Sequence, residues 1–511
     1  MLGIAIAIAI FLAALIVSWK NPRRGMLLCI AMLPWNGLEF DLGIRVNVYT
    51  MILLALIPPL FLKTRQRIGA LTDEKAFQAF FLFTSFVVTW SLLQIFVVPE
   101  AQVAGGFLRS PTIRAALQIL VFLLSISPLW LAPLIFRNGD DLMAAARVYV
   151  VSCYALAALG FVQIGVWYAT GNDPLPIGIL NQLVGGVNAD RTRSGIFVFE
   201  GNDLYRMSSL GGEPKGLGQS LVVAAFMLQA QYVFARRALT SRKLAAWCFL
   251  ILAVFATQST SAFGLLALSL LIAAVAYFMA SGKKSSAASL STVALVASLA
   301  GCLILSGMVF GEQQIERVST WTTNLLSERT VGRGSILEDF DQAIVGFLKD
   351  HPLDMLLGVG LGNIHLYADA YLPSVTRHYA GGAVFFAKSG YLKYLSESGI
   401  IGLSLFLLAC GSLYMRLNYW AKRARPFIRV ESWVPQLKLC FLYLAIAFLA
   451  RVYTGAHFFM AAGLVCATCG VLAAQLRMLG VQETAAFART GWAPSRVPVN
   501  DPALGMPGFR R

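Results

Sequence analysis

Two arginines four residues apart, Arg329 and Arg333, have a type and spacing suited to holding a phosphate. A helix should begin directly after them, because Ser335 and Glu338 have the spacing of a capping box. The first turn of a helix offers unpaired N–H groups and a positive dipole end, and guanidinium groups suit two-pronged phosphate contacts. The pattern therefore predicts a pyrophosphate clamp. The alternative is that the arginines only pair with nearby carboxylates, namely Glu328, Glu338, Asp339 or Asp341.

A third arginine, Arg206, lies in the stretch Arg-Met-Ser-Ser-Leu-Gly-Gly-Glu-Pro, shortly before an apolar run. A functional role is favoured for Arg206 over a purely structural one. Pro214 suits the first turn of the helix that should follow. Glu213 would then lie at or near the N-cap of that helix, so we expect it to support the site and not to react.

A lysine, Lys388, lies near the start of the stretch 386–409, which begins polar and continues as an apolar run. Five residues of this stretch recur at steps of three and four, and on a helix they would share one face: Lys388, Leu392, Leu395, Gly399 and Gly402. The glycines of this face would let another helix approach closely. Lys388 is therefore predicted at the mouth of a membrane helix.

Glu397 lies deeper in the same predicted helix, in an increasingly apolar environment. A carboxylate in a membrane helix is costly unless it is paired or protonated. Lys393 precedes it by one helical turn and is a candidate partner. We therefore expect a supporting role for Glu397.

The histidines add a candidate base, because His351, His365 and His378 all fall in the polar stretch before this helix. A zinc site would need ligands at a metal-binding spacing, and the stretch has neither such a pair nor a nearby cysteine. No metal or other cofactor is expected. One histidine acting as a general base is favoured, with His378 as the candidate.

The elements that must position these residues are apolar helices. The chain has 511 residues, of which 58% are hydrophobic, and its mean hydropathy is +0.70. A soluble domain has roughly 45–50% apolar residues. Apolar runs long enough to cross a bilayer recur along the whole sequence. We predict an all-α polytopic membrane protein with about 12–14 transmembrane helices and a large helical periplasmic loop.

The order of apolar and polar stretches predicts four parts. Residues 1–310 would form an N-terminal transmembrane bundle of about ten spans, with a periplasmic loop at 170–215. Residues 311–386 would form the large periplasmic loop, and 387–479 the C-terminal transmembrane helices. Residues 480–511 are rich in Pro, Gly and Arg and are predicted to be a disordered cytoplasmic tail.

The formal net charge of +16 does not indicate a nucleic-acid partner. Lys and Arg cluster in short connections between apolar runs, which is typical of the cytoplasmic side of a membrane protein. Asp and Glu concentrate in the segments that this topology places outside. The chain has no basic stripe with interleaved aromatic residues. The first apolar run lacks the basic n-region of a signal peptide and is followed by Lys20, Arg23 and Arg24, an order that places the N-terminus outside.

Two stretches of the chain resemble a known family. They are His351-Pro-Leu-Asp-Met-Leu-Leu-Gly-Val-Gly-Leu-Gly-Asn and Ser389-Gly-Tyr-Leu-Lys-Tyr-Leu-Ser-Glu-Ser-Gly399-Ile-Ile-Gly402. Together they are similar to the O-antigen ligase and Wzy-type polysaccharide polymerase superfamily. The family signature is a His followed by Asn, Ser or Gln, then nine residues, Gly, two residues and Gly, after a large periplasmic loop. Ser389 and the glycines match it, whereas Lys388 stands where the family has its His.

The resemblance implies roles for these residues. The family's His is taken to activate the acceptor hydroxyl, so Lys388 would be catalytic if it were deprotonated, with His378 or His365 as the substitute base. Ser389 and Glu397 would support it.

The stretch from Arg206 to Glu213-Pro214 also resembles the Arg…Glu-Pro segment of repeat-unit polymerases. Family members hold the lipid pyrophosphate with loop arginines, which implies that Arg206, Arg329 and Arg333 bind it. Arg333 would act on the leaving group and so be catalytic as well, and Glu213 would support the group.

The implied function is polymerisation of polyprenyl-pyrophosphate-linked oligosaccharide repeat units into exopolysaccharide or O-antigen, by metal-independent glycosyl transfer. It would take place at the periplasmic face of the bacterial inner membrane, with membrane lipid, a flippase and a chain-length regulator as further partners. One alternative is an O-antigen ligase that transfers finished glycan to a lipid A core or a protein. A second is a membrane transporter, although the chain shows few intramembrane charges and no repeated halves.

Overall fold

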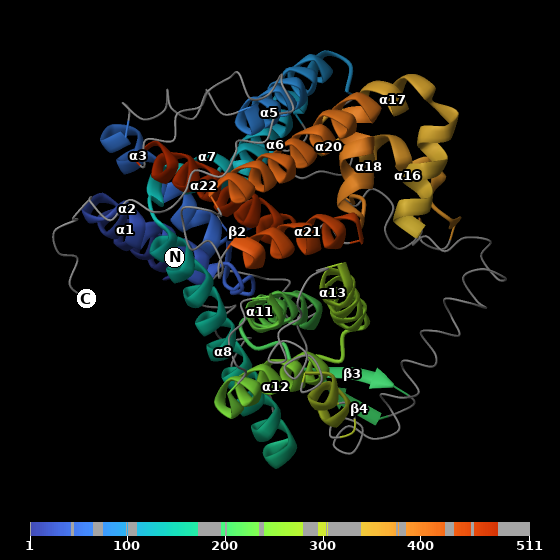
Figure 1. Cartoon of the computed structure of the whole chain (residues 1–511). Helices are drawn as coiled ribbons and strands as arrows, with labels where there is room; N and C mark the ends of the chain where they lie inside the picture. Colours follow the sequence, from blue (N-terminus) through green and yellow to red (C-terminus); the bar gives the residue numbers. More distant parts are fainter. Residues whose placement is uncertain are drawn as a thin grey trace, which may run out of the picture.

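The protein is a bundle of helices with a smaller group of helices at one end (Figure 1). The computed structural model describes residues 2–41, 45–64, 75–98, 100, 110–171, 196–199, 202–234, 240–279, 295–302, 304, 339–374, 377, 385–424, 434–450 and 454–478. Within these ranges the chain is helical apart from turns and two short antiparallel hairpins.

The N-terminal half supplies most of the bundle. Its labelled helices are α1 (Leu2–Lys20), α2 (Pro22–Met32), α3 (Val48–Thr64), α5 (Lys75–Leu93), η2 (Gln94–Phe96), α6 (Pro111–Ile126), α7 (Pro128–Ile135), α8 (Gly139–Thr170), α11 (Pro214–Phe234), α12 (Ser241–Ala256) and α13 (Thr260–Met279). The hairpins are β1 (Glu39–Asp41) with β2 (Arg45–Asn47) and β3 (Ile196–Phe199) with β4 (Asn202–Tyr205).

The C-terminal half adds long helices to the bundle and forms the smaller group. Its elements are α16 (Asp339–Asp350), α17 (Pro352–Leu357), α18 (Ile364–Ala368), η5 (Asp369–Tyr371), α20 (Gly390–Ala424), α21 (Val434–Ala450) and α22 (Gly455–Met478). α20 packs along α5, and α22 packs along α7.

Several helices have the length and composition to cross a membrane. Among the described residues, five are long and apolar enough: Phe77–Phe96, Pro111–Ile135, Gly139–Thr170, Gly390–Ala424 and Gly455–Leu476. Four shorter apolar helices are Ile4–Lys20, Val48–Leu62, Ser261–Val275 and Val434–Phe448. The predicted all-α, multi-pass membrane architecture is confirmed at this level. The total of 12–14 spans stays a prediction.

Residues 339–374, which we call the cap, form the smaller group from α16, α17, α18 and η5. The cap has its own apolar core, which includes Ile344, Phe347, Leu348, Ile364 and Leu372. Ile344, Phe347 and Leu348 are buried on α16, which ends at Asp350. The helix stops there because Pro352 lacks an N–H and starts α17 instead. The predicted capping box at Ser335 and Glu338 lies outside the described residues.

The cap is joined to α20 through two glycines. Inside α20, Gly399 has φ +68° and ψ −174°, and Gly358 at the end of α17 has φ +81° and ψ 167°. Both conformations belong to a region that essentially only glycine adopts. A Cβ on Gly399 would overlap the carbonyl of Leu356, and a Cβ on Gly358 would overlap the backbone at Glu397. The two backbones therefore touch directly.

This junction differs from the continuous helical face predicted from Lys388 to Gly402. Gly399 breaks α20, so the residues before and after it do not share one face. The element that approaches Gly399 is α17, a short helix of the cap, so the predicted close approach of another helix is confirmed there. Gly402 also meets a helix, because a Cβ there would lie 3.2 Å from Phe86 of α5.

We expect the substitution Gly399→Ala to loosen the cap, because alanine can neither adopt this backbone conformation nor fit against Leu356. The free energy of unfolding should fall by about 2–4 kcal/mol. Thermal unfolding of the detergent-purified protein measures the effect, and protease cleavage within the cap locates it.

The matched control for this substitution is Gly411→Ala on the same helix. A Cβ at Gly411 meets nothing within 4 Å, and alanine favours a helix interior over glycine by up to about 1 kcal/mol. Gly411→Ala should therefore leave the unfolding temperature unchanged or raise it. An equal fall in unfolding temperature for Gly399→Ala and Gly411→Ala would contradict the proposed role of the Gly399 backbone.

Candidate functional site

The head of α20 is fastened to the first turn of α16. Ser389 caps α20, since its Oγ and its carbonyl accept hydrogen bonds from the N–H groups of Leu392 (3.4 Å) and Lys393 (3.0 Å). The N–H of Lys388 donates to Oδ1 of Asp341 at 2.7 Å. Lys388 Nζ lies 5.8 Å from the centre of the Phe340 ring. The position of Lys388 is therefore set by α16.

Glu397 holds the loop 358–362, which we call the glycine loop. The carboxylate is 2% exposed, and its Oε1 accepts a hydrogen bond from the N–H of Gly362 at 3.0 Å. The carbonyls of Ser396 and Glu397, freed by the break at Gly399, accept from Val359 (3.0 Å) and Gly360 (2.9 Å). Glu397 thus holds the loop, while its predicted supporting role at an active site stays a prediction. Lys393 is not ion-paired with Glu397 in the described part of the chain, and its Nζ lies over the ring of Phe386.

The other side of the glycine loop is bound by α5. Trp90 Nε1 donates to the carbonyl of Gly358 at 2.9 Å, and the N–H of Leu361 donates to Ser91 Oγ at 3.1 Å. The loop therefore lies between α5 and α20, with its backbone hydrogen bonds directed to both helices. This arrangement fixes the cap on the end of the bundle.

A buried arginine completes the joint between cap and bundle. Arg114, in the first turn of α6, is 5% exposed, and its Nε donates to Asn363 Oδ1 at 3.2 Å. Asn363 Nδ2 in turn donates to the carbonyl of Val359 at 3.0 Å. Our sequence analysis missed Arg114. Its position in the sequence could have indicated it, because an ionisable residue at the start of an apolar span is costly to bury and often belongs to a functional site.

His365 lies beside this arginine and is 6% exposed. Burial lowers the pKa of His365 from 6.5 to about 4, and the charge of Arg114 lowers it further, against the opposing effect of Asp369. The imidazole is therefore neutral at neutral pH. Its Nδ1 has no hydrogen-bond partner within the described ranges. His365 was one of three histidines that the sequence offered as a base, and it is the one built into the joint.

Arg206 lies in a second buried segment, residues 206–213. Its Nε donates to the carbonyl of Thr257, in the turn between α12 and α13, at 3.4 Å. The N–H of Ser209 donates to Gln163 Oε1 at 2.8 Å, and Gly37 donates to the carbonyl of Leu210 at 3.1 Å. This segment is therefore wedged among the ends of α8, α12 and the chain before β1.

Glu213 ends that segment and starts α11. Its carbonyl accepts hydrogen bonds from Gly216 (2.9 Å) and Leu217 (3.1 Å), and its carboxylate pairs with Lys215 at 2.5 Å. Glu213 thus has the position at the helix start that the sequence predicts.

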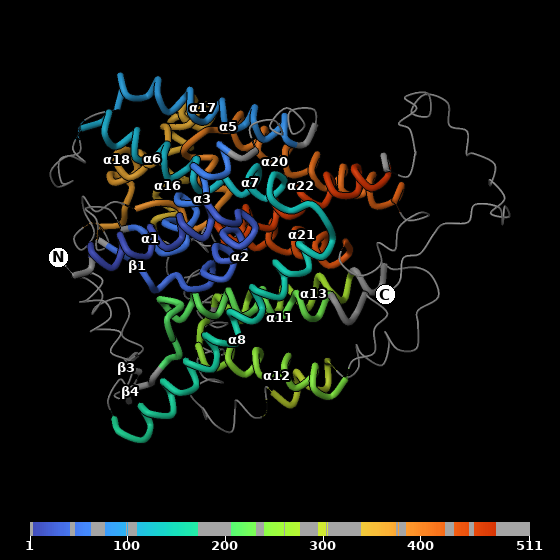
Figure 2. The backbone as a smooth tube through the Cα atoms, turned by 90° about the vertical axis from the view of Figure 1, so that its left-hand side faces the viewer, coloured from blue at the N-terminus to red at the C-terminus, as the bar shows by residue number. Residues whose placement is uncertain are grey.

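The structure separates the predicted site residues into two groups. Lys388, Ser389 and Glu397 all lie at or near the start of α20, where Lys388 contacts α16 and Glu397 contacts the glycine loop. Arg206 and Glu213 belong instead to the segment that follows β4. Figures 1 and 2 show β4 and the cap helices well apart along the vertical direction but at the same end of the bundle. Arg329, Arg333 and His378 lie outside the described residues, so their roles stay predictions. Within the described ranges, no three His, Cys, Asp or Glu side chains are grouped to hold a metal ion.

Comparison with known proteins adds no relative, since neither a family model nor a curated protein matches the chain. The functional argument therefore rests on the chain's own residues.

We expect the joint to weaken in acid because His365 resists protonation in the folded state. An opened joint would bind a proton near the usual pKa of 6.5, whereas the closed joint binds it only near pH 4. Stability contributed by the closed state is therefore lost as the pH falls from about 6.5 to about 4, by up to about 3 kcal/mol. Hydrogen exchange of residues 358–368, corrected for intrinsic rates, measures this loss.

His365→Gln should abolish the pH dependence, because it removes the titrating group. The control is His351→Gln, in the same cap, where the ring stacks on Phe347 and contacts that residue's carbonyl. That variant should keep the pH dependence of the wild type. If His365→Gln kept it as well, another group would be responsible.

Proposed function

We propose that the protein is a membrane glycosyltransferase that polymerises oligosaccharide repeat units carried on polyprenyl pyrophosphate. The observation that carries the proposal is the location of the family-like residues. Ser389, Glu397 and Gly399 lie where the cap is clamped onto α5, α6 and α20. An active site of this kind needs a rigid support, because the rate of glycosyl transfer depends on catalytic groups that are already in position before the reaction.

In the proposed reaction, a sugar hydroxyl on the acceptor repeat unit attacks the anomeric carbon of the donor. The new glycosidic bond forms as the bond from that carbon to the pyrophosphate oxygen breaks, with inversion. Negative charge grows on the leaving pyrophosphate, and Arg206, Arg329 and Arg333 would stabilise it there. The hydroxyl proton would pass to Lys388 or to His378. The reaction would use neither a nucleotide sugar nor a metal ion, and would take place at the periplasmic face of the inner membrane.

The buried polar side chains of the joint support this proposal indirectly. Arg114 and Glu397 fix the glycine loop from opposite sides, and α16 fixes Lys388 through Asp341. These are positioning residues. They would hold the acceptor-activating groups at a constant height above the membrane, within reach of a lipid-anchored donor.

We expect Arg206→Ala and Arg333→Ala to abolish long polymer without lowering the amount of protein in the membrane. Loss of one charge-assisted contact to a developing anion typically costs about 100- to 1,000-fold in rate. Polymer length is read from glycan gels, and protein amount from immunoblots of membranes. Arg377→Ala is the control, because Arg377 is half exposed and pairs with Asp369. Polymer of normal length from both Arg206→Ala and Arg333→Ala would contradict the proposed pyrophosphate clamp.

Lys388→Met should lower turnover by about 100-fold or more while leaving the donor KM nearly unchanged, if Lys388 takes the proton. Lys393→Met, five residues later in the first turn of α20, is the matched control and should keep turnover. The assay uses purified protein in liposomes with a lipid-linked repeat unit. If Lys388→Met left turnover unchanged, Lys388 would not be the base, and His378 would be the remaining candidate.

A deletion strain separates polymerase from ligase. A missing polymerase leaves single repeat units on the lipid carrier, whereas a missing ligase leaves full-length polymer that is not attached to its acceptor. We expect single repeats. Unattached long polymer would replace the proposal with the ligase, and normal glycan would favour a transporter.

A further inference from the structure

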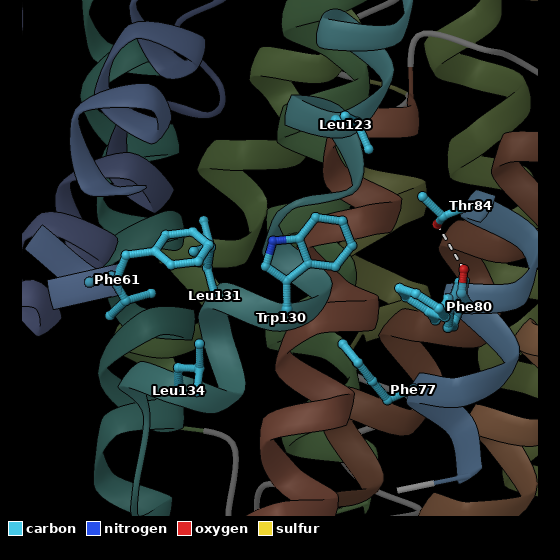
Figure 3. Close-up of a pocket in the computed structure, with 10 residues that line it drawn as sticks. Phe61, Phe77, Phe80, Thr84, Leu123, Trp130, Leu131 and Leu134 are labelled. Carbon is cyan, nitrogen blue, oxygen red and sulfur yellow. Dashed lines mark hydrogen bonds between the residues drawn. The ribbon is translucent and has the colours of Figure 1, made fainter. Parts of the chain in front are cut away.

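Several buried polar side chains of the apolar helices bond to a carbonyl of their own helix. In the apolar pocket between α3, α5 and the α6–α7 pair, Thr84 donates its hydroxyl hydrogen to the carbonyl of Phe80 at 2.7 Å (Figure 3). Thr468 of α22 bonds to its own helix in the same way. Gln163 of α8 is different, because it is fully buried and its amide bonds to another segment of the chain, within residues 206–213.

The Gln163 amide pairs with two consecutive serines. Its Oε1 accepts a hydrogen bond from the N–H of Ser209 at 2.8 Å, and its Nε2 donates to Ser208 Oγ at 3.4 Å. In an apolar environment such bonds are strong, and an amide without them would be costly to bury. α8 therefore fixes the backbone of the chain just after Arg206.

Ser209 has a backbone conformation that its residue type rarely adopts. Its φ is +49°, and in the described part of the chain the one other non-glycine residue with a positive φ is Gln258, at +48°. Both side chains are buried, with 1% and 2% of their surface exposed. Backbone conformations of this kind persist only where the surrounding structure imposes them, and they concentrate at functional sites.

Gln258 lies directly beyond the end of α12, at a position where helices commonly have glycine. Thr257 is the C-cap of α12. The carbonyl of Thr257 accepts the hydrogen bond from Arg206 Nε at 3.4 Å, and the carbonyl of Ala256 accepts one from the N–H of Met207 at 3.1 Å. The turn at Gln258 therefore ends α12 where its last carbonyls face Arg206 and Met207.

Both strained residues are thus connected to Arg206. The simpler interpretation is that Arg206 only caps α12, since an arginine near a helix C-terminus complements the helix dipole. Capping alone would not require strain at Ser209 and at Gln258, because an arginine on an unstrained backbone can bond to the last carbonyls of a helix. Strain is expected instead where a side chain must keep one orientation before a reaction.

We propose that Gln163 and Gln258 are positioning residues that fix the guanidinium of Arg206 before the lipid pyrophosphate binds. Gln163 imposes the turn at Ser209, and the turn at Gln258 directs the carbonyl of Thr257 toward Arg206 Nε. This role rests on the proposed function, because Arg206 is one of the arginines that would stabilise the leaving pyrophosphate. Both glutamines act through Arg206 and not on the substrate.

The first test combines Gln163→Leu with Arg206→Ala. The assay uses the full protein in liposomes and lipid-linked repeat units extracted from the deletion strain. Gln163→Leu should lower kcat about 100-fold with little change in KM, because a displaced catalytic group costs about that much. In the Arg206→Ala background, the same substitution should lower kcat by less than about threefold.

Three kinetic results would overturn the proposal. Losses that multiply in the double variant would show that Gln163 acts on the fold as a whole and not through Arg206. An unchanged kcat for Gln163→Leu, or a rise in KM alone, would show that it positions no group for the transition state.

The matched control is Gln436→Leu. Gln436 is a buried glutamine of α21, and its Nε2 donates to the carbonyl of Met227 at 2.9 Å. Gln436→Leu therefore removes a comparable amide bond away from residues 206–213, and it should leave kcat per folded molecule unchanged. A loss of kcat equal to that of Gln163→Leu would overturn the proposal.

Hydrogen exchange of residues 206–213 gives a measurement that needs no substrate. Gln163→Leu should accelerate this exchange at least about tenfold, and Gln436→Leu should not. Unchanged exchange in Gln163→Leu would overturn the proposal whatever the activity. Faster exchange in Gln163→Leu, together with a wild-type protein that forms no polymer, would overturn the proposed function and leave the hold of Gln163 on this segment in place.

A second pair of variants leaves α8 unchanged and decides the question if Gln163→Leu fails to fold. Gln258→Gly and Gln258→Ala both remove the amide, but only glycine adopts a positive φ without strain. Gln258→Gly should therefore retain at least about tenfold more turnover than Gln258→Ala. Equal turnover of the two variants would overturn the proposal, because the turn at Gln258 would then not position Arg206.

Discussion

The direct contact between two backbone segments, one at Gly358 and one at Gly399, governs the arrangement of this protein around its candidate site. Both glycines have conformations that essentially only glycine adopts, and a Cβ on either one would overlap the backbone of the other segment. This contact breaks α20 before it enters the bundle. The carbonyls released by the break are then available to the N–H groups of the glycine loop. One steric constraint therefore creates the hydrogen-bonding groups that hold the cap.

Buried polar groups turn this contact into a defined geometry. In a low-dielectric setting each hydrogen bond is strong, and each unpaired group is costly, so a satisfied network has few alternatives. Arg114 approaches the loop from α6, Glu397 from α20, and Trp90 and Ser91 from α5. The neutral imidazole of His365 fits beside Arg114 because a second positive charge there would be unfavourable. The proposed catalytic groups would inherit their positions from this network.

The parts of the structure that the sequence predicts well depend on local patterns. The apolar face of α16, its end before Pro352, the membrane-spanning helices and the position of Glu213 at the start of α11 all follow from periodicity and capping residues. The break at Gly399 could not be predicted, because a glycine that admits a neighbouring helix has the same local pattern as one that ends a helix. Arg114 was missed because its partner Asn363 lies 249 residues away in the chain. Arg329, Arg333 and His378 lie outside the described residues.

The hydrogen bond between Trp90 and Gly358 joins residues that are 268 positions apart. Contacts of such high sequence separation form late, because the intervening chain must first lose its freedom. During synthesis, α5 and α6 enter the membrane long before the ribosome reaches Gly358 or Gly399. Throughout that interval, the cap residues that bind Trp90, Ser91 and Arg114 have not yet been synthesised. Chains interrupted before residue 399 would keep these groups exposed at the membrane surface, where surveillance proteases could distinguish them from finished molecules.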